Sequence, residues 1–223
     1  MRYSCLLIDH DDTTVDSTPS IHHPAHIAQM KRLGREELIM SLEDWFRINY
    51  SPGLRPYIDE VFGLSEAEKQ VCHEVWREHT TTATPPFFAG ILAFLQRYRE
   101  RGGIIVVVSH SEEDIIRRHY ATQNEVPGFM PDFIIGWNGD GTKNKPYTWP
   151  VERVLEEFGL EREELLVVDD LQPGITMATN AGVDSAAVGW SHGLEEIKRD
   201  ISRKSTYYAD TLSELEEIVF GAT

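Results

Sequence analysis

The chain lacks the features that would place it in a membrane or outside the cell. Its 223 residues include two cysteines, Cys5 and Cys72, which make no disulfide framework. No apolar run approaches the ~20 residues that a membrane-spanning helix needs, and residues 1 to 4 lack the anatomy of a signal peptide. We therefore expect a soluble protein of the reducing cytoplasm.

Positive charge is also scarce in this chain. There are 21 lysine and arginine residues against 37 aspartate and glutamate residues, which gives a formal net charge of −16. Nucleic acids and anionic membranes bind basic surfaces that release counterions, so this balance argues against both as partners. An anionic substrate would have to be held by a few local positive groups, which makes single lysines in loops important candidates.

The length and composition are those of a globular protein. Hydrophobic residues make up 41% of the chain and charged residues 26%. A chain of this length can bury roughly 70% of its unfolded surface, in one large α/β domain or in a core with a smaller inserted domain. We expect a monomer or a small homo-oligomer.

Short apolar runs alternate with helical patterns through most of the chain. The runs predicted to be strands are residues 5–8, 104–108, 133–135, 165–168 and 186–188. The segments predicted to be helices between and after them are residues 91–98, 112–120, 151–158, 175–181 and 212–218. Strands that alternate with helices imply a parallel sheet. We therefore predict an α/β fold with a doubly wound, Rossmann-like parallel sheet.

One segment departs from this alternation. From about residue 20 to residue 82 there is no convincing strand, and apolar residues recur at helical spacing. Ser65, which follows Gly63-Leu64 and precedes Glu66 and Glu68, has the pattern of a helix N-cap. We predict two domains. The core comprises residues 1–17 and 86–223, and a helical domain comprises residues 18–85.

Two acids follow the first predicted strand directly. Asp9 and Asp11 stand at its carboxyl end, where ligands bind in open α/β sheets. Residues two apart in an extended chain point the same way, so both carboxylates can share one site, where their repulsion requires a cation or a shared proton. The alternative is an ordinary polar turn that caps the next helix.

Further polar residues follow other strands of the predicted sheet. They are Ser109, Lys145 in the loop after the third strand, and the pair Asp169 and Asp170. Singly, each could cap a helix, form a turn or lie in solvent. Together they place acids, a hydroxyl and an ammonium group along one edge of one sheet. This set suits phosphoryl transfer, because a divalent cation and a lysine can offset the charge of a phosphate, and Mg²⁺ is the usual cation there.

The order of these residues resembles the motifs of the haloacid dehalogenase superfamily. Asp9-x-Asp11-x-Thr13 is similar to the first motif, the apolar strand that ends at Ser109 to the second, and Lys145-Pro146 to the third. Asp169-Asp170, followed by Ala181-Gly182, is similar to the fourth. The helical segment after the first motif looks like the family's helical cap. Within the superfamily, the chain resembles the phosphoglycolate phosphatase and β-phosphoglucomutase subgroup.

The resemblance implies a role for each of these residues. Asp9 would be the nucleophile that forms an aspartyl-phosphate, and Asp11 would protonate the leaving alcohol and then activate water. The cofactor would be Mg²⁺, bridging Asp9, the main-chain carbonyl of Asp11 and an acid of the fourth motif. The residues expected to bind the substrate phosphate are Thr13, Ser109, His110 and Lys145.

Two positions depart from the family pattern. Position 12 is aspartate where many relatives have glycine, and position 174 is glycine where many relatives have a second metal-binding acid. The side chains of Asp169 and Asp170 would diverge on an extended strand, so only one is expected to reach a metal directly unless the chain turns there. Counting back from Ala181-Gly182 assigns Asp170 as this ligand, with Asp169 orienting a metal-bound water or Lys145.

The predicted function is a Mg²⁺-dependent phosphatase that acts on a small phosphorylated metabolite. A sugar-phosphate phosphomutase shares the same core and would differ in its product. A dehalogenase is less favoured, because halide leaves without needing an acid such as Asp11. A non-catalytic relative that binds a phosphorylated ligand is the alternative that Gly174 motivates.

Overall fold

The computed structural model describes residues 1–221, apart from the side chain of Arg55. The chain divides into two compact units. One comprises Met1–Val15 together with the chain from Phe87 onward, and the other comprises Asp16–Pro86. The first unit contains every strand of the sheet, and the second is helical.

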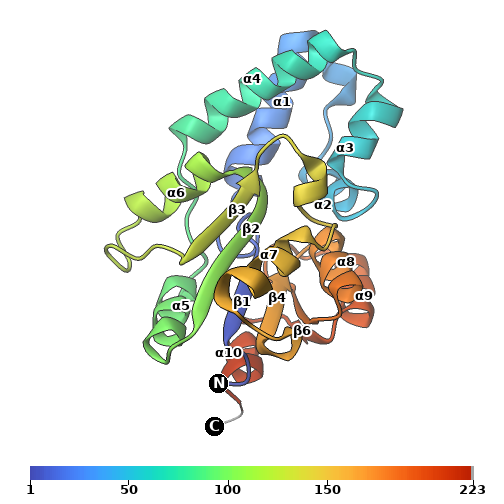
Figure 1. The fold of residues 1–223 in the computed structure, drawn as a ribbon. Coiled ribbons are helices and arrows are strands. Elements are labelled where there is room, and N and C mark those ends of the chain that lie inside the picture. Colours follow the sequence, from blue (N-terminus) through green and yellow to red (C-terminus); the bar gives the residue numbers. More distant parts are fainter. Residues whose placement is uncertain (222–223) are drawn as a thin grey trace. The chain divides into compact units, whose positions relative to one another are not determined.

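The first unit is built on one parallel sheet of six strands (Figure 1). The strands are β1 (Cys5–Ile8), β2 (Ile104–Glu112), β3 (Phe133–Trp137), β4 (Leu165–Asp169), β5 (Asp184–Val188) and β6 (Tyr207–Ala209). Their order in the sheet is β3-β2-β1-β4-β5-β6, and every neighbouring pair is parallel. The order grows outward in both directions from β1, which confirms the predicted doubly wound α/β fold.

Helices cover both faces of this sheet, which explains why β1 is an unbroken apolar run. Leu6 and Ile8 pack on one face with the apolar sides of α5 (Ile91–Glu100) and α10 (Leu212–Phe220). Cys5 and Leu7 pack on the other face with α7 (Trp149–Phe158) and α8 (Gln172–Ala181). Successive side chains of a strand point to opposite faces, so both sets must be apolar when both faces are covered.

Other elements of this unit differ from the sequence-based expectation. Strand β2 continues to Glu112, past its predicted end at Val108, with a register shift against β3 over its last residues. The short strand β6 was not predicted, because only three residues pair and two of them are half-exposed tyrosines. Helix α6 (Glu113–Thr122) agrees with the helix predicted over residues 112–120. Helix α9 (Glu195–Lys204) was not predicted, because it is mostly charged and only its two isoleucines are buried. Two 3₁₀ turns complete the unit, η4 (Gly141–Lys143) and η5 (Arg162–Glu164).

The second unit is a small helical assembly. Its elements are η1 (Thr18–His22), α1 (His23–Leu33), η2 (Glu36–Leu38), α2 (Leu42–Tyr50), α3 (Leu54–Tyr57), η3 (Ile58–Phe62) and α4 (Glu66–Thr82). Helices α1 and α4 lie side by side (Figure 1), and Met30 and Cys72 share a buried cluster with Phe62. The predicted N-cap at Ser65 is confirmed, because Ser65 and Glu68 form a reciprocal capping box at the start of α4.

Among residues 1–221, no helix has both the length and the apolar composition that crossing a membrane would require.

Candidate active site

Strand register brings the acids at the ends of β1 and β4 together. Ile8 of β1 pairs with Val168 of β4, and the next residues along the two strands are Asp9 and Asp169. The backbone N–H of Asp9 donates to the carbonyl of Val168 at 2.8 Å, so the pairing continues to the edge of the sheet. The two acids therefore emerge side by side at the carboxyl ends of neighbouring strands, where open α/β sheets bind their ligands.

Lys145 joins these two acids. Its Nζ donates to Asp9 Oδ1 at 2.6 Å and to Asp169 Oδ2 at 2.7 Å, and its side chain is only 3% exposed. Burial alone would lower the pKa of Lys145, but the charges and hydrogen bonds of Asp169 and Asp9 outweigh it and raise that pKa above its ordinary value. The lysine is therefore a fixed positive charge at the centre of the site.

Asp170 adds a third carboxylate. Asp9, Asp169 and Asp170 each offer an oxygen within 4.8 Å of the others, and all three residues are buried. Burial is the main cause that raises the pKa of Asp9 and of Asp170 above the usual range, and neighbouring carboxylates add to it. One ammonium cannot balance three buried carboxylates, and clustered hard oxygen donors are what Mg²⁺ prefers. The residues at this site therefore fit a divalent cation.

The consecutive acids Asp169 and Asp170 converge, although side chains on an extended strand would diverge. Strand β4 ends at Asp169, and the chain bends at Asp170 before α8 begins. The backbone N–H of Leu171 donates to Asp169 Oδ1 at 2.8 Å, which closes this turn. The turn after the strand is what lets both carboxylates face one point.

Thr13 connects the first and fourth motifs. Its hydroxyl lies 3.1 Å from Asp170 Oδ1 and 3.3 Å from Asp9 Oδ2, and it is fully buried. The loop reaches this position through Asp12, whose φ of 59° lies in the left-handed region. Aspartate tolerates that region better than most residues, and glycine tolerates it best. The departure at position 12 is thus compatible with the loop's conformation.

The side chain of Asp11 is not part of the acid cluster found among residues 1–221. Its Oδ2 instead accepts hydrogen bonds from Ser109 Oγ at 3.0 Å and from Ser111 Oγ at 2.7 Å. The hydroxyl of Ser109, a residue that the sequence predicts to bind phosphate, is directed to Asp11 in this structure. Sequence reasoning missed Ser111, although its position two residues after Ser109 on a strand would have placed both side chains on one face.

The loop that carries Lys145 is tied to the end of β2. Asn144 Nδ2 donates to the carbonyl of Ser109 at 2.7 Å, and Asn144 Oδ1 accepts from the backbone N–H of Lys145 at 2.7 Å. His110, expected near the phosphate, has an exposed side chain whose Nε2 lies 2.9 Å from the Lys145 carbonyl. Sequence reasoning also missed Asn144, whose only signal was its place next to Lys145.

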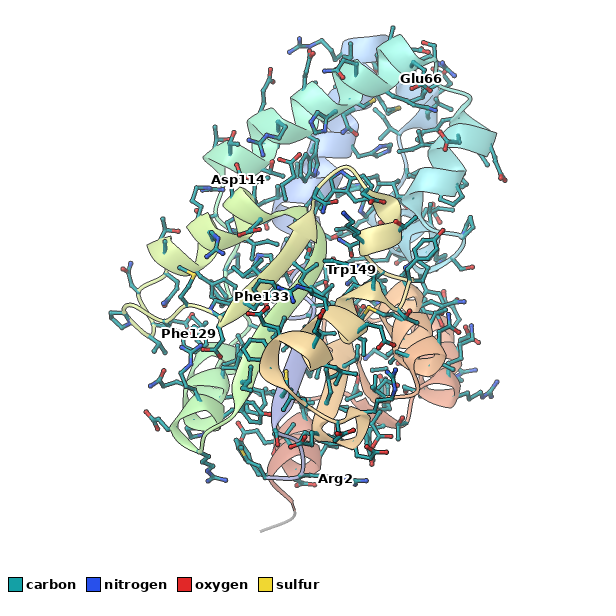
Figure 2. All side chains as sticks on the ribbon, in the orientation of Figure 1. Arg2, Glu66, Asp114, Phe129, Phe133 and Trp149 are labelled. Atoms are coloured by element: carbon teal, nitrogen blue, oxygen red, sulfur yellow. The ribbon has the colours of Figure 1, made fainter. Side chains whose placement is uncertain are left out.

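The second lysine of this loop lies elsewhere. Lys143 Nζ is 3.7 Å from Asp140 Oδ2, and both side chains are nearly half exposed. The chain then passes Lys145 and begins α7 at Trp149, which is labelled in Figure 2 and is 37% exposed. The structure therefore brings Lys145 to the acids and leaves Lys143 at the surface.

Comparison with known proteins identifies the family of this chain. The model of the haloacid dehalogenase-like hydrolases matches residues 6–188. A 5′-nucleotidase from Pseudomonas aeruginosa is 25% identical over 225 residues, which cover 98% of this chain and 96% of that protein.

Solved structures share the fold at lower identity. A predicted phosphatase from Clostridium acetobutylicum has a TM-score of 0.81 at 17% identity, with 100% of each chain covered. CbbY from Rhodobacter sphaeroides, in complex with xylulose-1,5-bisphosphate, has a TM-score of 0.74 at 16% identity, with 96% of each chain covered. The family match spans most of the chain, from the first strand to the fifth. The chain therefore belongs to the haloacid dehalogenase-like hydrolases and is an enzyme of that family.

Proposed function

We propose that this hydrolase is a Mg²⁺-dependent phosphatase that cleaves phosphate monoesters of small metabolites through an aspartyl-phosphate on Asp9. The observation that carries the proposal is the buried lysine bound to two acids. Lys145 contacts Asp9 and Asp169 at 2.6 and 2.7 Å, and Asp170 completes the cluster. A nucleophilic carboxylate must approach an anionic phosphate, and a fixed ammonium group reduces that repulsion.

The chemistry proceeds in two displacements. A carboxylate oxygen of Asp9 forms a bond to phosphorus while the bond between phosphorus and the leaving alcohol's oxygen breaks, and Asp11 gives a proton to that leaving oxygen. Water then attacks the aspartyl-phosphate, Asp11 accepts its proton, and release of phosphate regenerates Asp9. Two easier steps replace one hard displacement, which is the general advantage of a covalent intermediate.

The acid cluster would hold the cofactor. Asp9, Asp169 and Asp170 form the acid cluster. Asp9 and Asp170 would bind Mg²⁺ and Asp169 would support them, and the ion would supply positive charge against the phosphate and the carboxylates. Thr13 orients two of these acids through its contacts with Asp9 and Asp170. Lys145 holds the remaining oxygen of Asp9 and one oxygen of Asp169.

Nucleoside 5′-monophosphates are the substrate class that we put first. The support is the P. aeruginosa relative named a 5′-nucleotidase, which matches this chain over nearly its whole length. Residues 18–85 would act as the substrate-selecting cap that the family resemblance implies. A cytoplasmic location stays a prediction from the sequence.

The proposal is tested by measuring phosphate release from a panel of phosphorylated metabolites with and without Mg²⁺. The panel should contain nucleoside 5′-monophosphates, phosphoglycolate and sugar phosphates, and halide release from a 2-haloacid should be assayed separately. We expect Mg²⁺-dependent phosphate release with a preference within the panel. Isomerised sugar phosphate without net phosphate release would identify a phosphomutase, halide release a dehalogenase, and binding without turnover a non-catalytic protein.

A further inference from the structure

The proposed acid–base residue is held by a serine that lies outside the four motifs. Asp11 Oδ2 accepts from Ser111 Oγ at 2.7 Å, a shorter contact than the 3.0 Å to Ser109 Oγ. Ser111 is buried, whereas Asp11 is only half-buried. A half-buried side chain can change rotamer, so a hydrogen bond from a buried hydroxyl restricts the direction that its carboxylate faces.

We propose that Ser111 is a positioning residue for Asp11, and that it aims the Asp11 carboxyl group at the oxygen of the leaving alcohol. This inference rests on the proposed phosphatase function. It gives Ser111 a role different from that expected of Ser109, because Ser111 acts through Asp11 and not on the phosphate.

The end of β2, which carries Ser111, is irregular. The register between β2 and β3 shifts between Val108 and Glu112, so the end of β2 does not continue the regular ladder. Such a bulge redirects side chains and is frequent next to active sites. Here it lies in the part of β2 that carries Ser111.

Gly136 of β3 makes this path possible. A β-carbon added at Gly136 would lie 2.9 Å from the carbonyl oxygen of Ser111 and 2.5 Å from the backbone nitrogen of Glu113. The end of β2 therefore packs directly against the backbone of β3. A side chain at position 136 would push the backbone of Ser111 away, so the glycine permits this close approach.

Hydrogen bonds also couple Ser111 to the loop of Lys145. The backbone N–H of Ser111 donates to Ser109 Oγ at 3.0 Å, and this hydroxyl in turn donates to Asp11. The carbonyl of Ser109 accepts from Asn144, which accepts from the backbone of Lys145. The end of β2 is thus hydrogen-bonded both to Asp11, the proposed acid–base residue, and to the loop that carries Lys145.

The test compares leaving groups. An alkyl phosphate needs a proton on its leaving oxygen, whereas p-nitrophenyl phosphate has a leaving group that departs without one. We expect Ser111→Ala to lower kcat/KM for the alkyl phosphate by about 10- to 100-fold, part of the 10²- to 10⁴-fold that a positioned acid supplies. For p-nitrophenyl phosphate the loss should stay below about threefold, because only the acid step is impaired.

Two control variants separate positioning from folding. Ser111→Thr keeps the hydroxyl and should restore most of the alkyl phosphate activity. Ser185→Ala removes another buried strand serine, one that bonds the backbone N–H of Thr206 at 3.2 Å, and should leave the ratio between the two substrates unchanged. Equal losses on both substrates in Ser111→Ala, or no loss on either, would overturn the proposal.

A second readout does not depend on turnover. Crystal structures of the wild type and of Ser111→Ala should show the Asp11 carboxylate in different rotamers. An Asp11 that keeps its place without the Ser111 hydroxyl would overturn the proposal even if the wild type were active. A wild type that releases phosphate from no substrate would contradict the proposed function alone, and the rotamer comparison would still decide the role of Ser111.

Discussion

The carboxylate of Asp169 fills the space next to the α-carbon of Gly174. A β-carbon added at Gly174 would lie 2.0 Å from Asp169 Oδ2 and 2.3 Å from its Cγ, distances that no real side chain could tolerate. A side chain at position 174 and the carboxylate of Asp169 would therefore occupy the same volume. Asp169 supplies a carboxylate to the site from the end of β4, so the glycine does not leave the site short of acids.

We expect Gly174→Ala to displace Asp169 from Lys145. Overpacking of this kind costs about 1–3 kcal/mol of unfolding free energy, and activity should fall because the ion pair is disturbed. Denaturant unfolding and phosphate release measure both effects. Gly193→Ala is the matched control, because an added β-carbon there has nothing within 4 Å. Equal behaviour of the two variants would contradict the steric argument.

Replacing Asp9 by asparagine should abolish phosphate release and leave the fold intact. The amide keeps the shape of the side chain but lacks the nucleophilic carboxylate. An assay of phosphate release measures the activity, and circular dichroism checks that the variant is folded. Asp140→Asn, at an exposed position on the surface loop, serves as the control and should retain activity. Turnover of Asp9→Asn near the wild-type rate would remove Asp9 from the nucleophile's role.

The two lysines of the loop after β3 should differ sharply. Lys145→Ala leaves two buried carboxylates without their cation, a change that typically costs about 3–5 kcal/mol of stability, and should reduce activity at least about tenfold because the phosphate also loses a fixed positive charge. Lys143→Ala breaks an exposed contact of 3.7 Å, a class of pair worth about 0–1 kcal/mol. Kinetics and thermal melts of both variants test the ranking, which a larger effect at Lys143 would reverse.

Removal of either fourth-motif acid should weaken Mg²⁺ binding. We expect Asp170→Asn to raise the Mg²⁺ concentration for half-maximal activity more than Asp169→Asn, because Asp170 is the assigned direct ligand while Asp169 is engaged by Lys145 at 2.7 Å. Loss of a supporting partner typically costs about 10- to 100-fold in metal affinity or activity. Mg²⁺-induced shifts of the thermal midpoint give a readout without turnover. An unchanged requirement in both variants would place the ion elsewhere.

The helical unit should lose stability in mild acid through His26. Burial is the main cause that lowers the pKa of His26 to about 4, and His23 adds to it, while the ring accepts a hydrogen bond from the Met40 N–H at 3.0 Å. Between pH 4 and the ordinary histidine value of about 6.5, the unfolded chain binds a proton that the folded chain does not, so stability falls as the pH drops through this window.

The expected loss from His26 is roughly 3 kcal/mol across that window, since each unit of pKa shift corresponds to about 1.4 kcal/mol. Urea unfolding of the wild type and of His26→Gln at several pH values isolates this contribution from that of the carboxylates. The difference in unfolding free energy between the two proteins should shrink toward pH 4. A difference independent of pH would show that His26 does not titrate in the folded state as stated.

The amino-acid sequence by itself determined the fold class and the identity of the main polar residues. Apolar runs such as Cys5–Ile8 are local signals, and their alternation with helical segments indicates a parallel sheet without knowledge of any contact. Asp9 and Lys145 could be singled out because each follows a strand, and strands of a parallel sheet end at one edge. The capping box at Ser65 is likewise encoded within four residues.

Only the tertiary structure decided how these residues meet. The contact of Ser111 with Asp11 joins residues 100 positions apart, at the ends of the neighbouring strands β2 and β1, and no local pattern encodes which strands become neighbours. The convergence of Asp169 and Asp170 depends on a turn after β4, and the room for Asp169 depends on Gly174. Packing sets these positions, because two segments can approach closely only where no side chain lies between them. Which segments become neighbours depends on the order of the strands in the whole sheet.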